Sequence, residues 1–369
     1  MKYLSFLLAV VFFVSCNPAT KQKKDSADIS NQYSWALLPF TKADDVNPIL
    51  LPDTNSIFHC PVRNADVQWE EKDVFNPAAV VKNDTVFLLF RAEDSIGKYA
   101  GTSRIGIAWS TDGLHFTKHP KPVLYPDNDS SRIYEWEGGC EDPRVVENEN
   151  GTYYMTYTAY DGDKARLLVA SSKDLYHWTK HGPVFKNDTS YVNTWSKSGS
   201  IVCKYENGKA IAVKIQGKYC MYWGDTDIFI ASSDDLIHWI VIDDNNSKVK
   251  TIFGPRPKKF DSDLVEPGPP AMLTDDGVIL IYNSRNVRSK GDTSLAEGTY
   301  AASQILFDKT DPAKVVDRMN TYFMKPDKPY EITGQVNHVC FVEGLVHYKG
   351  KWFLYYGTAD SKIAVAVRQ

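Results

Sequence analysis

The sequence lacks the features that mark metal-binding, membrane-spanning and nucleic-acid-binding proteins. Only six cysteines occur in 369 residues, and no two of them have Cys-x-x-Cys spacing, so neither a zinc site nor a disulfide framework is indicated. The formal net charge is only −4, which provides no basic field for nucleic acid. Beyond the N-terminus, no apolar run is long enough to cross a membrane. We therefore expect no metal, no cofactor and no nucleic-acid partner.

The N-terminal segment is predicted to direct export. Lys2 precedes an apolar stretch over residues 3–14 that is too short to span a membrane and is typical of a secretion signal. Phe13-Val-Ser-Cys16 resembles a bacterial lipobox, although Phe13 replaces the usual aliphatic residue. We expect a signal peptide at 1–16 with lipidation at Cys16, a flexible tether at 17–31 and a catalytic domain at 32–369. The protein would be a periplasmic or outer-membrane lipoprotein; the alternative is a plainly secreted chain cut near Cys16.

The remaining chain contains an internal repeat. An apolar strand followed by Ala-x-Ser-x-Asp-(Gly/Leu)-x-x-(Phe/Trp) recurs about every 60 residues, and each copy follows an aromatic strand. The full copies occupy 105–116, 167–178 and 228–239, the weaker ones 300–306 and 363–367, and the aromatic strands 86–90, 153–157, 219–223, 278–282 and 352–356. Five strand pairs without convincing helices between them predict an all-β fold, a five-bladed β-propeller.

The conserved spacing within the repeat is explained by structure rather than catalysis. Serine and aspartate are expected to cap a hairpin turn, and the final aromatic residue to pack between blades. In a propeller the inner strands converge on a central channel, so polar residues that end these strands meet there. The candidate site must therefore be sought among polar residues outside the repeat.

One such group of residues surrounds a turn at 135–144. Glu137, Glu141 and Asp142 lie within six positions of one another, and two glycines follow Glu137. Pro143 follows Asp142 and restricts it towards extended geometry. These carboxylates are suited to a site. Alternatively, Asp142 caps the turn and pairs locally with Arg144.

Other polar residues interrupt the pattern in the same way. Arg91 ends an apolar strand and is expected either to pair with Glu93 or Asp142 or to donate to a sugar hydroxyl. Two carboxylates suffice for glycosidic cleavage, one as acid and one activating water. Glu266, in a proline-rich loop, is the leading base; the alternative is a loop salt bridge. Further candidates are Asp225 and Glu343 as alternative bases and the segment Trp195-Ser-Lys-Ser198.

Several motifs together resemble glycoside hydrolase family 130, which comprises mannoside phosphorylases and β-mannosidases on a five-bladed propeller. They are Phe75-Asn-Pro-Ala-Ala, Phe90-Arg-Ala-Glu, Glu141-Asp-Pro-Arg-Val, Tyr153-Tyr-Met-Thr-Tyr-Thr-Ala-Tyr, Tyr330-Glu-Ile-Thr-Gly and Tyr356-Gly-Thr-Ala-Asp. The resemblance implies that Asp142 donates the proton through a mannose hydroxyl, that Asn76, Arg91 and Asp360 line the mannose subsite, and that the reaction inverts the anomeric centre.

The sequence departs from the phosphorylases of that family at one place. Where they carry His-Arg-Pro, this chain has Tyr222-Trp-Gly-Asp225. The change removes side chains that could donate hydrogen bonds to a phosphate ion, and Asp225 adds a negative charge. Glu266, and alternatively Asp225, would then activate water, although Arg166 and Lys197 leave a residual anion site open.

We therefore expect an inverting hydrolase of β-mannosidic linkages, with β-1,2-linked manno-oligosaccharides as the leading substrates. The alternatives are a mannoside phosphorylase and a non-catalytic glycan-binding lipoprotein. The residues expected to bind substrate are Asn76, Arg91, Glu141, Arg144, Arg166, Lys197, Trp223 and Asp360.

Overall fold

The computed structural model describes residues 29–244 and 248–369, and this part of the chain is almost entirely β-structure. Its helices are short: α2 (Arg132–Glu135), α3 (Pro329–Ile332) and a turn at 29–32. Within these ranges no helix has the length and apolarity needed to span a membrane. The all-β prediction is confirmed, whereas the signal peptide at 1–16, with Cys16, lies outside the described residues.

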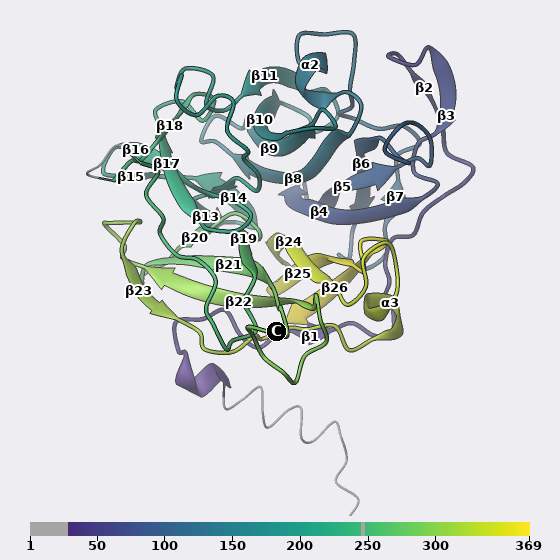
Figure 1. Ribbon diagram of the computed structural model, residues 1–369. Helices are drawn as coiled ribbons and strands as arrows, with labels where there is room; N and C mark the ends of the chain where they lie inside the picture. Colours follow the sequence, from purple (N-terminus) through teal and green to yellow (C-terminus); the bar gives the residue numbers. More distant parts are fainter. Residues whose placement is uncertain (1–28, 245–247) are drawn as a thin grey trace, which may run out of the picture.

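The strands form successive antiparallel groups around a common centre, in the manner of a β-propeller (Figure 1). The first groups are β4 (Asp73–Lys82), β5 (Thr85–Glu93), β6 (Ser103–Ser110) and β7 (Thr117–Lys118), then β8 (Gly139–Glu147), β9 (Tyr153–Tyr160), β10 (Ala165–Ser172) and β11 (Thr179–Pro183). Next come β12 (Ser200–Ile201), β15 (Lys214–Ile215), β16 (Lys218–Trp223), β17 (Phe229–Ser233) and β18 (Trp239–Val241). They are followed by β19 (Leu264–Pro267), β20 (Met272–Leu273), β21 (Val278–Arg285), β22 (Tyr300–Phe307) and β23 (Val315–Arg318), and then by β24 (Cys340–Tyr348), β25 (Lys351–Thr358) and β26 (Lys362–Arg368).

Two hairpins accompany these groups. The hairpin of β2 (Ile57–Cys60) and β3 (Ala65–Gln68) stands apart, and that of β13 (Cys203–Glu206) and β14 (Lys209–Ala212) links β8 to β20 through single parallel bridges.

Every aromatic strand predicted from the repeat pairs with the strand that follows it. The pairs are β5 with β6, β9 with β10, β16 with β17, β21 with β22 and β25 with β26. Apolar faces of neighbouring groups bury one another: Phe90 of β5 and Tyr355 of β25, for example, belong to one core cluster. The five cysteines within the described ranges are buried and free.

The repeat motif caps turns as predicted. Asp112 Oδ1 accepts a hydrogen bond from Ser110 Oγ at 2.8 Å and from two main-chain N–H groups of the following turn. Asp174 and Asp235 repeat these contacts. The aromatic residue that ends the first copy, Phe116, packs edge-on against Tyr355 of the last group, with ring centroids 5.7 Å apart. The motif is therefore structural.

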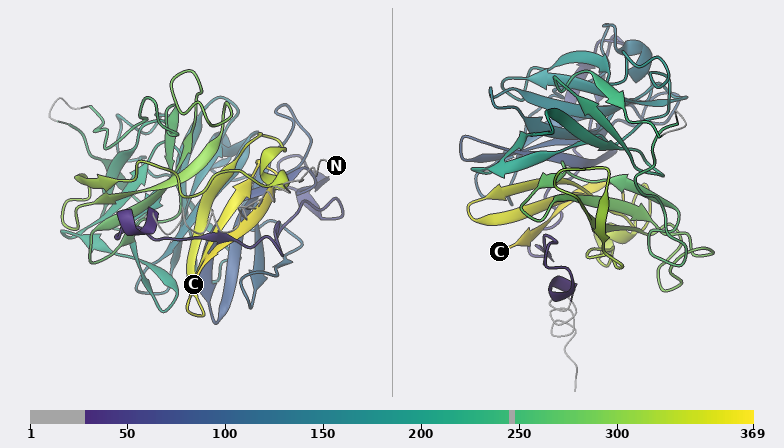
Figure 2. Two further views of the ribbon diagram at one scale, coloured as in Figure 1. Left: turned by 90° about the horizontal axis from the view of Figure 1, so that it is seen from below. Right: turned by 90° about the vertical axis from the view of Figure 1, so that its left-hand side faces the viewer.

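The N-terminal segment completes the last group of strands. β1 (Thr41–Lys42) pairs antiparallel with β26, and Figure 2 shows the purple N-terminal segment running along the yellow C-terminal strands. Ile29 packs against a small cluster that includes Tyr33 and Met319. The predicted tether is therefore wrong for residues 29–31, because Ile29 begins a helical turn that is packed on the domain.

Candidate active site

Irregularities in three inner strands turn polar side chains towards the centre. The register with the neighbouring strand shifts at Asn76 in β4, at Asp142 and Pro143 in β8, and at Glu343 in β24. Asn76 and Asp142 have φ angles of 46° and 47°. A β-bulge re-aims a side chain that a regular strand would point elsewhere, so the bulges bring these three residues together.

Asp142 is buried, accepts two hydrogen bonds and forms an ion pair with Lys197. Asn76 Nδ2 donates to Asp142 Oδ1 at 2.9 Å, and Arg91 Nη1 donates to the same oxygen at 3.3 Å. Lys197 Nζ lies 3.9 Å from Asp142 Oδ2. Burial opposes the negative charge, but Arg91, Lys197 and Asn76 outweigh burial and lower the pKa of Asp142. Asp142 is therefore ionised at neutral pH.

Asn76 retains a free acceptor beside this carboxylate. Its Oδ1 is buried and has no hydrogen-bond partner among the described residues. A Cβ on Gly357 would lie 2.2 Å from that oxygen, so the glycine of the Tyr-Gly-Thr-Ala-Asp motif leaves room for the amide. A buried unpaired acceptor is costly in a folded protein, and a ligand hydroxyl would satisfy it.

Arg144 is a buried clamp and not a partner of the Asp142 carboxylate. Its Nη1 donates to the main-chain oxygen of Asp142 at 3.2 Å, its Nη2 to Pro267 O at 2.6 Å and its Nε to Gly268 O at 2.7 Å. The local pairing considered for Asp142 is therefore wrong. Arg144 is buried and holds the bulge of β8 against the loop after Glu266.

Glu266 faces the same site from β19. Ser198 Oγ donates to Glu266 Oε1. Burial raises the pKa of Glu266 to about 7, against the opposing charge of Lys197. Because Lys197 interacts electrostatically with both Glu266 and Asp142, the two predicted catalytic carboxyls lie near the same ammonium group. They do not lie on opposite rims.

Further carboxyls surround the pair. Glu141 Oε1 accepts from Arg91 Nη2 at 3.0 Å. Burial raises the pKa of Asp360 to about 7 despite the nearby guanidinium of Arg91. Glu343 is completely buried, its oxygens lack hydrogen-bond partners within the described residues, and Arg144 Nη2 lies 3.5 Å away. Since Glu343 has no solvent exposure, Glu266 is better placed to meet a water molecule.

The remaining candidate residues are paired with other side chains or packed in the core. Arg166 Nη1 is paired with Asp161 Oδ2 at 2.6 Å. Trp223 is 1% exposed and packs between Phe185 and Phe229, at centroid distances of 4.9 and 4.8 Å, so it supports the fold instead of offering a face to a sugar. Asp225 Oδ2 accepts from Trp195 Nε1 at 2.8 Å. Neither Trp195 nor Ser198 had a role assigned from the sequence.

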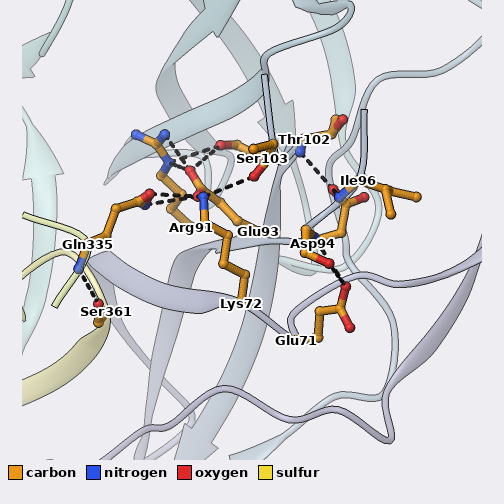
Figure 3. A network of polar contacts seen from close by, with 12 residues as sticks. Glu71, Lys72, Arg91, Glu93, Asp94, Ile96, Thr102, Ser103, Gln335 and Ser361 are labelled. Carbon is orange, nitrogen blue, oxygen red and sulfur yellow. Dashed lines mark hydrogen bonds and ion pairs between the residues drawn. The ribbon is translucent and has the colours of Figure 1, made fainter. Parts of the chain in front are cut away.

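A second polar network orients Arg91. Glu93 Oε1 accepts from Arg91 Nη2 at 2.7 Å and from Ser103 Oγ at 3.1 Å, while Glu93 Oε2 accepts from Lys72 Nζ and Gln335 Nε2, each at 3.0 Å. Figure 3 shows Glu93 between these groups. Burial opposes ionisation, but the charges of Arg91 and Lys72 lower the pKa of Glu93. Glu93 therefore positions Arg91, and the pairing of Arg91 with Glu93 or Asp142 expected from the sequence is confirmed for both carboxylates.

Replacing Glu93 with glutamine is expected to reduce kcat/KM by about 10- to 100-fold, the range for losing a hydrogen bond between charged groups. With Glu93 neutral, more of the Arg91 charge acts on Asp142, so the acidic limb of the pH profile should move to lower pH. Glu71→Gln is the control, because Glu71 bonds Ser95 in the same network and does not contact Arg91. An unchanged profile with full activity would contradict this role.

Comparison with known proteins identifies the family. Residues 45–369 match the glycoside hydrolase family 130 model, described as β-1,4-mannooligosaccharide phosphorylase. A 1,2-β-oligomannan phosphorylase of Thermoanaerobacter sp. (strain X514) is 32% identical over 329 residues, which cover 87% of this chain and 94% of the relative. A glycosyl hydrolase structure from Bacteroides ovatus has 45% identity and a TM-score of 0.89, covering 91% of this chain and 95% of its own.

Another solved structure was reported with the statement that this family of mannoside phosphorylases contains glycoside hydrolases that target β-1,2 mannosidic linkages in Candida mannan. It has 44% identity and a TM-score of 0.88, covering 91% of this chain and 95% of its own. The family match spans most of the chain and includes every catalytic candidate named above, so this protein belongs to glycoside hydrolase family 130, an enzyme family that acts on mannosides.

Proposed function

We propose that the protein is an inverting β-mannosidase on a five-bladed propeller, with Asp142 as proton donor, Glu266 as the base that activates water, and β-1,2-linked manno-oligosaccharides as substrates. The observation that carries this proposal is the pair of buried carboxyls that both interact with Lys197, one ionised and one with a pKa of about 7. Inverting glycosidases use two carboxyls in this way.

The charge of the site favours water over phosphate as the nucleophile. Six acidic side chains face or adjoin the site, namely Glu141, Asp142, Asp225, Glu266, Glu343 and Asp360, against the cations Arg91, Arg144 and Lys197. Arg166 is already neutralised by Asp161. Arg91 and Lys197 already face Asp142, and Arg144 donates to main-chain oxygens, so a phosphate dianion would compete with these partners for the cations, whereas a water molecule beside Glu266 meets a base.

The number of protons held by Asp142 and Glu266 matches the requirement of an inverting hydrolysis. Hydrolysis needs one proton on the two carboxyls: the base takes a proton from water while the acid supplies one to the leaving oxygen, here through a mannose hydroxyl held near Asp142. At neutral pH the free site carries that single proton mainly on Glu266, because Asp142 is ionised. The reactive form places the proton on Asp142, and the two forms have the same pH dependence.

The rate is therefore expected to fall above about pH 7. The pair holds one proton between the lowered pKa of Asp142 and the raised pKa of Glu266, about 7, so kcat/KM should be maximal there and fall about tenfold per pH unit above it. Ser198→Ala removes a donor that stabilises ionised Glu266, so its alkaline limb should move to higher pH. A wild-type profile that is flat through pH 9 would contradict this assignment.

The second candidate is a phosphorylase, favoured by the activities named for the curated relatives. The two functions are separated by incubating β-1,2- and β-1,4-linked mannobiose with and without phosphate, and by following the product anomer with NMR. Phosphate-independent release of α-mannose supports the hydrolase, whereas release of mannose 1-phosphate only with phosphate overturns it. Binding without cleavage in either condition would instead indicate the glycan-binding alternative.

We also propose that the enzyme is exported and anchored through Cys16, on the strength of the N-terminal sequence alone. Export is consistent with hydrolysis, since a sugar phosphate made outside the cytoplasm would not be retained. Replacing Cys16 with serine should release the protein from the membrane fraction, and metabolic labelling with a palmitate analogue should disappear.

A further inference from the structure

An exposed tryptophan stands in the segment that leads into the site, and the reaction proposed above does not use it. Trp195 is 46% exposed, whereas the nearby Ser196 and Ser198 are buried. No other tryptophan in the described ranges appears among the exposed large apolar side chains. Large exposed aromatic residues often mark binding surfaces when a polar group fixes their orientation.

The indole of Trp195 is fixed by such a group. Its Nε1 donates to Asp225 Oδ2 at 2.8 Å, and the main chains of the two segments are joined by the hydrogen bond from Gly224 N to Lys197 O at 3.0 Å. The N–H of the indole is thereby occupied, so the ring offers a ligand its apolar face. A fixed ring also loses little entropy on binding.

The ring lies at the margin of the catalytic site. Asp225, which holds it, acts electrostatically on both Glu266 and Lys197, and Lys197 in turn lies 3.9 Å from Asp142. Asn76 lies on β4, Arg91 on β5 and Asp360 in the turn between β25 and β26, and all three are near Asp142. When the mannose that is cleaved off is held by those three residues, a saccharide of more than one ring therefore extends towards the segment that carries Trp195 and Lys197.

We propose that Trp195 is the stacking surface for a second pyranose of the bound manno-oligosaccharide, outside the mannose ring held by Asn76, Arg91 and Asp360. The proposal rests on the substrate class given above. It assigns to Trp195 a part in recognising chain length, since a monosaccharide fills the inner subsite without reaching the indole.

The test measures binding in a Glu266→Gln background by calorimetry, with mannose, β-1,2-mannobiose and β-1,4-mannobiose as ligands. Trp195→Ala should weaken binding of at least one mannobiose by about 10- to 100-fold, the range for losing the burial of a large apolar side chain, and leave mannose within about threefold. Trp195→Phe keeps an aromatic face and should stay within about fivefold of the parent for that mannobiose.

The matched control is Trp35, whose Nε1 donates to Asp317 Oδ2 at 2.9 Å in the N-terminal segment. Trp35→Ala should not alter the affinity for mannose or for either mannobiose. Parent-like mannobiose binding by Trp195→Ala, or an equal loss for mannose, would overturn the proposal. Wild-type cleavage is assayed separately, so failure of hydrolysis is visible as such; a parent that binds neither mannobiose would overturn the substrate class together with the role of Trp195.

Discussion

Glu266→Gln is expected to lower kcat by about 10²- to 10⁴-fold, the contribution typical of a positioned general base. Glutamine keeps the size of the side chain and can still accept a hydrogen bond from Ser198, but it cannot take a proton from water. The change also removes a buried carboxyl whose ionisation is disfavoured, so the fold should not suffer. Turnover of β-1,2-mannobiose and a thermal unfolding curve measure the two effects.

Two companion variants make this result interpretable. Glu147→Gln is the control, because Glu147 is a buried carboxyl paired with Lys209 at 2.7 Å at the other end of β8 from Asp142, and turnover should be retained. Asp142→Asn should lower kcat at least as strongly as Glu266→Gln does, and the double variant should be little worse than either single one, since both residues serve one step. Full activity in either single variant removes that residue from the mechanism.

The parts of the fold predictable from the sequence are those with local periodicity. β5 and β6 are largely apolar strands joined by residues 94–102, and β25 and β26 are joined by residues 359–361, so each pair is visible within a short window of the sequence. The turn aspartates are equally local: Asp112 binds only groups within three positions of itself. The strand pairs and the structural role of the motif were therefore predicted correctly.

The inner strands were harder to predict because the site interrupts their pattern. β4, β8 and β24 each contain a bulge at the polar residue, which breaks the alternation that identifies a strand. The role of Arg144 was missed for a related reason. Its partners are main-chain oxygens 123 and 124 positions away, and nothing in the residues around Arg144 distinguishes a clamp for a distant loop from a substrate contact.

A second feature invisible in the sequence is a buried acid and base pair that recurs in different strand groups. Glu331 accepts from Tyr356 Oη at 2.9 Å and from Lys42 Nζ at 2.7 Å. Glu135 accepts from Tyr157 Oη at 2.8 Å and from Lys180 Nζ at 2.6 Å. In both cases the acid lies on a one-turn helix, α3 or α2, and the lysine lies on the outermost strand, β1 or β11. In each of these two strand groups, the ion pair therefore holds the outermost strand to the short helix.

Breaking this pair at β1 is expected to lower the stability of the fold strongly. Glu331→Leu leaves Lys42, whose side chain is 11% exposed, with a buried charge, and removing one partner of a buried ion pair typically costs about 3–5 kcal/mol. Asp327, 2.8 Å from Lys42 Nζ, remains and should hold the loss near the lower limit, about 3 kcal/mol. Urea unfolding measures the loss, and limited proteolysis should show earlier cleavage before β1, because Lys42 holds that strand to α3.

Two further variants distinguish an unpaired buried charge from a general weakness of the chain. Asp234→Ala removes the exposed pair with Lys218, 2.6 Å apart, and should change the unfolding free energy by less than about 1 kcal/mol. Adding Lys42→Met to Glu331→Leu removes the orphaned ammonium and should restore much of the loss, since an apolar pair can replace a buried ion pair. If the double variant is less stable than Glu331→Leu alone, the destabilisation does not arise from the charge, and the fastening of β1 must be attributed to the hydrogen bonds of Lys42 with Lys325 O and Asp327.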